Sequence, residues 1–154
     1  MNKTINIIKK EDTIKMLLKI KEHSYQEGEI RLNNAHLKNL NKKTIYKPFK
    51  KNDLFINLST LHDAMQPGGS RGRHHYHGLS VEEVYDVLLN LKNSIGVCPS
   101  FGSRYIILTT VIANCGYKII AIIDTKAPLM NDRNANVNKL ITFYPKDVDE
   151  RKFK

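Results

Sequence analysis

RYIILTTVIANCGYKIIAIID (residues 104–124) is the stretch that decides the fold. It contains two β-branched, apolar runs, Arg104–Ile112 and Tyr117–Asp124, separated by the turn residues Asn114-Cys115-Gly116. Runs of this kind around a glycine-containing turn predict a β-hairpin. IGVCP (residues 95–99) and NKLITFYP (residues 138–145) predict two more strands. The C-terminal part of the chain therefore predicts an antiparallel sheet of about four strands.

The chain upstream of this sheet carries helix signals. Ser80-Val81-Glu82-Glu83 has the pattern of a capping box and predicts a helix that runs to about Asn93. Residues 11–26 predict an earlier helix, with Ile14, Leu17, Leu18 and Tyr25 recurring at helical spacing and Gly28 ending it. Residues 51–65 predict a helix that the cluster Pro67-Gly68-Gly69 ends.

The remaining segments carry weaker signals. TINII (residues 4–8) and GEIRLN (residues 28–33) predict short strands. The lysine-rich segment up to Lys51 and the asparagine-rich segment after Pro128 predict loops. We therefore expect an α+β fold with N-terminal helices packed on the C-terminal sheet. We expect residues 1–66 to form a basic helical N-terminal region and residues 67–154 an α+β core, and at this length we expect both to belong to one compact domain.

The charge of the chain indicates an anionic partner. Twenty-five Lys and Arg residues against 15 Asp and Glu residues give a formal net charge of +10. The segment His36–Lys51 holds six lysines and no acid, and within it we select Lys42, Lys43 and Lys47 as phosphate-contacting candidates. A lysine-rich composition, or an ordinary solvated loop, would give the same pattern.

Other sequence features bear on compartment and metal binding. Cys98 and Cys115 are too far apart for a Cys-x-x-Cys motif, so reduced thiols are expected. The N-terminus has no long apolar run, and so we expect no secretory signal and no membrane association. The expected location is the cytoplasm of a bacterial or phage-infected cell, or a target cell into which the protein is delivered.

The segment SRGRHHYHGLS (residues 70–80) carries the histidines that point to chemistry. The adjacent His74 and His75 cannot both face one metal ion in a regular element, and no His-Glu-x-x-His motif accompanies them, so we expect no metal and no cofactor. Imidazoles can instead take and give protons near neutral pH, as cleavage of a phosphodiester requires. His77, His75 and His74 are the acid/base candidates, although hydrogen bonding within a loop would also explain them. Arg71, Arg73 and Arg104 can supply positive charge to a phosphate.

The last predicted strand adds a second observation. Alternation along residues 140–145 places Thr142 and Tyr144 on one face and Ile141 and Phe143 on the other, where they can join the core. We expect the histidine segment to lie over the hydroxyl-bearing face, within reach of one phosphate group. Thr and Tyr are also common in strands for purely structural reasons.

The order of a His-rich segment, the HGLSVEEV helix, the RYIILTTV and YKIIAIID strands and NKLITFYPKD resembles a superfamily of metal-independent ribonucleases. It groups barnase, EndoU and the colicin tRNases, and the similarity is greatest to its phage-encoded branch, over about residues 71–147. The resemblance implies helices on a four-stranded antiparallel sheet with the active site on the exposed sheet face. It implies an acid/base role for His77, His74 or His75 and phosphate contacts for Thr142 and Tyr144, with Lys139 and Lys146 as counterparts of a catalytic lysine.

The leading functional hypothesis is an endoribonuclease, acting as a toxin or phage effector, in which the 2′-OH attacks the phosphate and leaves a 2′,3′-cyclic phosphate. The expected partners are RNA, with tRNA or another structured RNA as substrate, and an acidic antitoxin or immunity protein. The alternative is a non-catalytic protein that binds nucleic acid, takes over a host function or inhibits an acidic protein.

Overall fold

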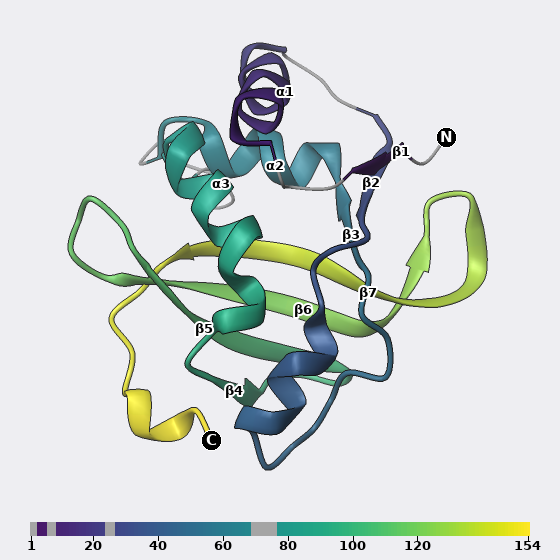
Figure 1. Ribbon diagram of the computed structural model, residues 1–154, viewed down its shortest axis with the longest axis vertical. Helices are drawn as coiled ribbons and strands as arrows, with labels where there is room; N and C mark the ends of the chain where they lie inside the picture. The colour runs from purple at the N-terminus through teal and green to yellow at the C-terminus, as the bar shows by residue number, and fades with distance from the viewer. Residues whose placement is uncertain (1–2, 6–8, 24–26, 69–76) are drawn as a thin grey trace.

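The computed structural model describes residues 3–5, 9–23, 27–68 and 77–154, and it has an α+β fold. Its strands form one mixed sheet of seven, in the order β1-β2-β3-β7-β6-β5-β4 (Figure 1). Two helices and three strands come from the N-terminal part of the chain, whereas a third helix and four strands come from the C-terminal part. The expected α+β class is confirmed, but the sheet is larger than the expected four strands.

The antiparallel half of the sheet is the half that the apolar runs predict. Its strands are β4 (Gly96–Pro99), β5 (Arg104–Ile112), β6 (Lys118–Leu129) and β7 (Asp132–Pro145), and each is antiparallel to the next. The expectation of an asparagine-rich loop after Pro128 is wrong. Those residues continue the β6–β7 ladder, in which Ala127 pairs with Val137, and only Met130 and Asn131 separate the two strands.

The other half of the sheet comes from the N-terminal region. Its strands are β1 (Lys3–Ile5), β2 (Glu29–Leu32) and β3 (Leu54–Asn57). The expected helix over residues 51–65 is wrong at its start, because β3 lies between β2 and β7, where Leu54 and Ile56 are both completely buried. Because β3 pairs with β7, residues 1–66 share one sheet with the rest of the chain and are not purely helical.

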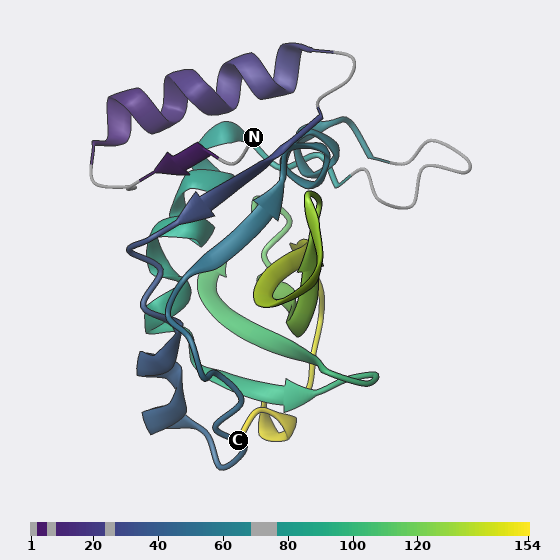
Figure 2. The same cartoon turned by 90° about the vertical axis from the view of Figure 1, so that its right-hand side faces the viewer.

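The helical elements cover one face of the sheet, except for the last 3₁₀ turn, which belongs to the C-terminal segment. They are α1 (Lys10–Glu22), α2 (Leu58–Met65) and α3 (Val81–Asn90), with 3₁₀ turns η1 (Leu37–Lys43), η2 (Leu91–Asn93) and η3 (Glu150–Lys152). Figure 2 shows α3 and η1 on one side of the sheet and α1 across its top. The lysine-rich segment is thus partly 3₁₀-helical rather than a simple loop.

Local signals account well for α3 and less well for α1. The Ser80 hydroxyl accepts the Glu83 N–H, and the Glu83 carboxylate accepts the Ser80 N–H, so the capping box is present. Helix α1 ends at Glu22 instead of Gly28, and it buries Thr13, Leu17 and Ile20 while Leu18 remains 41% exposed. Tyr25 and residues 6–8 of the first expected strand lie outside the described residues.

Cross-strand pairing separates the sheet into a helix-covered face and an opposite face. Val97, Ile107, Ala121 and Phe143 form a completely buried row beneath the helices. On the opposite face, the row Cys98, Ile106, Ile122 and Thr142 keeps partial exposure. The C-terminal segment covers part of this opposite face, since a Cβ on Gly96 would lie 2.9 Å from the Phe153 carbonyl oxygen. The face as a whole is therefore partly closed and partly accessible.

A register shift changes one expectation for β7. Thr142 pairs with Ile122 and Leu140 pairs with Ile123, which leaves Ile141 as an extra residue in β7. Leu140 and Phe143 consequently fill the core, and Ile141 is only half-buried. The expected core position of Phe143 is confirmed, whereas that of Ile141 is wrong.

Candidate active site

The structure brings His77, Thr142 and Tyr144 together. His77 Nε2 lies 3.2 Å from Thr142 Oγ1, and the imidazole stacks on the Tyr144 ring with centroids 5.0 Å apart and an interplanar angle of 27°. All three residues are partly exposed. Thr142 and Tyr144 are two residues apart in β7 and share the sheet face opposite to Phe143. An imidazole, a hydroxyl and a phenol thus converge on a surface that solvent reaches.

Backbone hydrogen bonds hold His77 in this position. The N–H groups of His77, Gly78 and Leu79 donate to the carbonyls of Asp63, Gln66 and Ala64, at 3.3, 2.7 and 2.9 Å. Gly78 has φ +64°, a left-handed conformation that suits glycine. Leu79 is 3% exposed and anchors the segment in the core, and Ser80 then begins α3. These bonds attach residues 77–79 to the C-terminal end of α2, directly before the start of α3.

The other candidates of the histidine segment lie in a part of the chain that the structure does not describe. Arg71, Arg73, His74 and His75 lie outside the described residues. Their expected roles stay predictions.

Arg104 lies on the same sheet face but is engaged elsewhere. It pairs across the strands with Asp124, and its Nε is 3.8 Å from an Asp124 carboxylate oxygen. The same carboxylate accepts the Ser103 hydroxyl at 2.6 Å and the Lys126 N–H at 2.9 Å. In the sheet, Arg104 is two strands away from Thr142 and one row further along. The structure thus places Arg104 beside Asp124 and not beside His77.

Lys139 has a structural environment that the sequence did not indicate. Its Nζ lies 2.8 Å from Glu29 Oε2, and the exposed fractions of the two side chains are 11% and 0%. Glu29 also accepts the Met130 N–H at the tip of the β6–β7 hairpin, at 2.9 Å. Lys139 is thus covered from solvent in its pair with Glu29, and its expected role as a counterpart of a catalytic lysine stays a prediction.

The remaining lysine candidates are exposed, and one of them, Lys146, lies two residues after Tyr144 in the chain. Lys42 and Lys43 end η1, Lys47 follows it, and Lys146 follows β7 beside Lys118 and Asp147 around a small surface cavity. Their positions are compatible with contacts to a polyanion, which stays a prediction.

Sequence patterns gave no reason to select two residues that lie next to the cluster. His62 is 8% exposed, and its Nδ1 lies 2.9 Å from the Asp63 carboxylate. Asp63 in turn accepts the His77 N–H through its carbonyl. The sequence signal was a His-Asp dipeptide within an apolar helical pattern, which by itself does not distinguish a core histidine from a functional one.

The described residues contain no group of three or more His, Cys, Asp or Glu side chains arranged to hold a metal ion. Within the same residues, every helix is too short or too polar to cross a membrane.

The arrangement is suited to proton transfer beside an anion. The imidazole can exchange a proton near neutral pH, and the hydroxyls of Thr142 and Tyr144 can donate hydrogen bonds to phosphate oxygens. The stacked Tyr144 ring restricts the orientation of the imidazole.

No family model, curated protein or solved structure matches the chain.

Proposed function

We propose that the protein is a metal-independent endoribonuclease whose active site contains His77, Thr142 and Tyr144. The observation that carries the proposal is the contact between His77 and two hydroxyl-bearing residues on an accessible sheet face. These groups come from segments 65 residues apart in the chain. Their convergence brings an acid/base group and hydrogen-bond donors for a phosphate to one point.

The chemistry follows from the substrate. His77 accepts the proton of a ribose 2′-OH, and the 2′-oxygen forms a bond to the adjacent phosphorus while the bond from phosphorus to the 5′-oxygen breaks. The products are a 2′,3′-cyclic phosphate and a 5′-OH, whose proton comes from solvent water, and the proton taken up by His77 then returns to solvent. Hydrogen bonds from Thr142 and Tyr144 offset the charge that develops on the phosphate oxygens. The nucleophile belongs to the RNA itself, so this step requires no activated water.

The proposal is tested by incubating purified protein with total RNA and with tRNA in excess EDTA and analysing the ends of the products. We expect 2′,3′-cyclic phosphate ends from the wild type and from His23→Ala, a control that removes an exposed histidine at the end of α1. We expect cleavage by His77→Ala to be slower by about 10²- to 10⁴-fold. Intact RNA with the wild-type protein, or equal cleavage by His77→Ala and the control, would contradict the proposal.

A second candidate is a non-catalytic protein that binds nucleic acid without cleaving it and takes over a host function. The observation that favours it is the net charge of +10 together with the exposed lysines of the η1 region. Binding of RNA without cleavage in the same experiment would support this candidate.

A further inference from the structure

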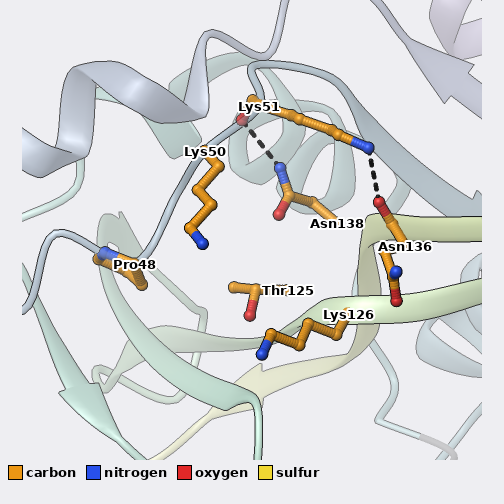
Figure 3. Close-up of a pocket in the computed structure, with 7 residues that line it drawn as sticks. All are labelled: Pro48, Lys50, Lys51, Thr125, Lys126, Asn136 and Asn138. Carbon is orange, nitrogen blue, oxygen red and sulfur yellow. Dashed lines mark hydrogen bonds between the residues drawn. The ribbon is translucent and has the colours of Figure 1, made fainter.

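A basic region lies beside the N-terminal half of β7, whereas Thr142 and Tyr144 lie near its C-terminal end. A cavity of about 280 Å³ is lined by the loop before β3 (Lys50 and Lys51), by Thr125 and Lys126 of β6 and by Asn136 and Asn138 of β7 (Figure 3). A neighbouring cavity of about 450 Å³ shares Lys50, Lys51 and Asn138 and adds Arg31 and Lys38. We call these two adjoining cavities the lysine groove.

The charge of the lysine groove is strongly positive. Lys50, Lys51 and Lys126 contribute three ammonium groups to the first cavity, and none of the described residues that line it is acidic. The acid of the second cavity, Asp53, is bound by the Arg31 guanidinium. The potential of the groove is therefore not cancelled from within, and it attracts anions.

The walls of the groove are held in place by their own hydrogen bonds. Lys51 Nζ donates to the Asn136 carbonyl at 2.8 Å, and the Asn138 amide donates to the carbonyls of Lys51 and Asp53 at 2.9 and 3.2 Å. Lys50 and Lys126 are exposed, as Lys51 is, and Figure 3 shows the side chains of Lys50 and Lys126 extending from opposite walls toward Thr125. The ammonium groups of Lys50 and Lys126 are therefore accessible to a ligand, in a groove whose walls are already held in place by hydrogen bonds.

The position of the groove relates it to the candidate active site. Pairing between β3 and β7 begins at Asn138, so the upstream part of β7 has β6 as its one neighbour among the described strands. Four residues of strand separate Asn138 from Thr142, a distance of about 13 Å. A single nucleotide at His77 would not reach the groove, whereas a longer RNA would.

From this geometry we infer that the lysine groove binds the phosphodiester backbone of RNA several nucleotides away from the scissile bond. The inference rests on the proposed function in taking RNA as the ligand. Lys50 and Lys126 each neutralise a phosphate. Backbone contacts of this kind raise the affinity for all sequences and are weakened by salt. The preferred substrate is therefore an RNA long enough to occupy both the groove and the His77 site.

The test compares Lys50→Gln/Lys126→Gln with Lys15→Gln/Lys19→Gln, a control that removes the same charge from exposed positions of α1. Both pairs are made in the His77→Ala background, so that RNA stays intact during the measurement. Binding of a fluorescein-labelled single-stranded RNA of about 20 nucleotides is followed by anisotropy at several salt concentrations. We expect binding about 10- to 30-fold weaker for the groove pair near 0.1 M salt, with a salt slope smaller by about 1.4, and little change for the control.

Cleavage assays with His77 intact supply the second readout. The groove pair is expected to raise KM for the long RNA with kcat unchanged, and to leave cleavage of a dinucleotide unaffected. Equal effects of the two pairs on RNA binding would overturn the inference even if RNA is cleaved, and so would an absence of binding at low salt. A selective loss of binding in the groove pair, in a protein that cleaves no RNA, would support the groove and overturn the ribonuclease proposal.

Discussion

Lys139 and Thr142 stand three residues apart in the same strand and on the same sheet face, yet they have opposite environments. Lys139 is buried against the fully covered carboxylate of Glu29, beneath the tip of the β6–β7 hairpin. Thr142 remains partly exposed and contacts His77. The hairpin covers one part of the face and leaves the next part accessible. A polar residue in β7 therefore serves the fold or the proposed chemistry according to what lies above it.

The comparison predicts the largest effect for His77→Ala, and that effect should concern activity. Loss of a group that transfers protons lowers kcat by about 10²- to 10⁴-fold. The side chain is only partly buried, and so its loss should change the free energy of unfolding by no more than about 1.5 kcal/mol. Steady-state cleavage and urea unfolding of the same preparation measure both quantities. Unfolding of the variant under assay conditions would show that His77 has a structural role instead.

The Lys139 side of the comparison predicts a large effect on stability. Lys139→Met leaves the Glu29 carboxylate buried without its cation, which should lower the free energy of unfolding by about 3–5 kcal/mol. Addition of Glu29→Gln should recover much of the loss, because no uncompensated charge remains. Urea unfolding of both variants measures this.

The matched control for Lys139→Met is Lys118→Met, which breaks the exposed pair between Lys118 and Glu150. An exposed pair contributes at most about 1 kcal/mol. If both lysine variants lose the same stability, burial does not distinguish the two pairs and the contrast with Thr142 disappears.

A smaller effect is expected for Thr142→Val, which removes the hydroxyl with little change in shape. Loss of one hydrogen bond to a phosphate should reduce kcat by about 10-fold. Thr110→Val, at an exposed position of β5, is the control and should cleave RNA at the wild-type rate. Wild-type kinetics for Thr142→Val would remove this hydroxyl from the proposed mechanism.

The smallest effect is expected for Ser80→Ala, which removes the capping box of α3 three residues after His77. The loss should be about 1 kcal/mol of unfolding free energy, measured against the exposed control Ser100→Ala. The cleavage rate should stay close to that of the wild type, because backbone hydrogen bonds tie His77 to α2. A strong decrease in rate would show that α3 also positions the imidazole.

Local sequence patterns predicted the parts of the fold that depend on short-range interactions. The β5–β6 hairpin follows from two apolar runs around Asn114-Cys115-Gly116, and the start of α3 follows from the Ser80 and Glu83 pair. Both depend on residues close together in the chain. The same reasoning failed for Leu54–Asn57, where apolar spacing fits a strand and a helix equally, and only the neighbours β2 and β7 select the strand.

For the candidate site, the sequence supplied the residues and the alternation that places Thr142 and Tyr144 on one face. It did not indicate the burial of Lys139, because its partner Glu29 is in a strand on the far side of β3. Nor did it indicate the pairing of Arg104 with Asp124 or the roles of His62 and Asp63. Exposure and pairing of a charged side chain depend on segments distant in the chain.

The sequence by itself therefore determined the α+β class, the antiparallel C-terminal strands and the chemical groups available on them, because turns, caps and side-chain alternation are local properties. The tertiary structure decided which groups meet. The contact of His77 with Thr142 across 65 residues, and the cover that the hairpin places over Lys139, exist only once the sheet has formed. The physical reason is that solvent exposure and mutual distance are set by packing between segments.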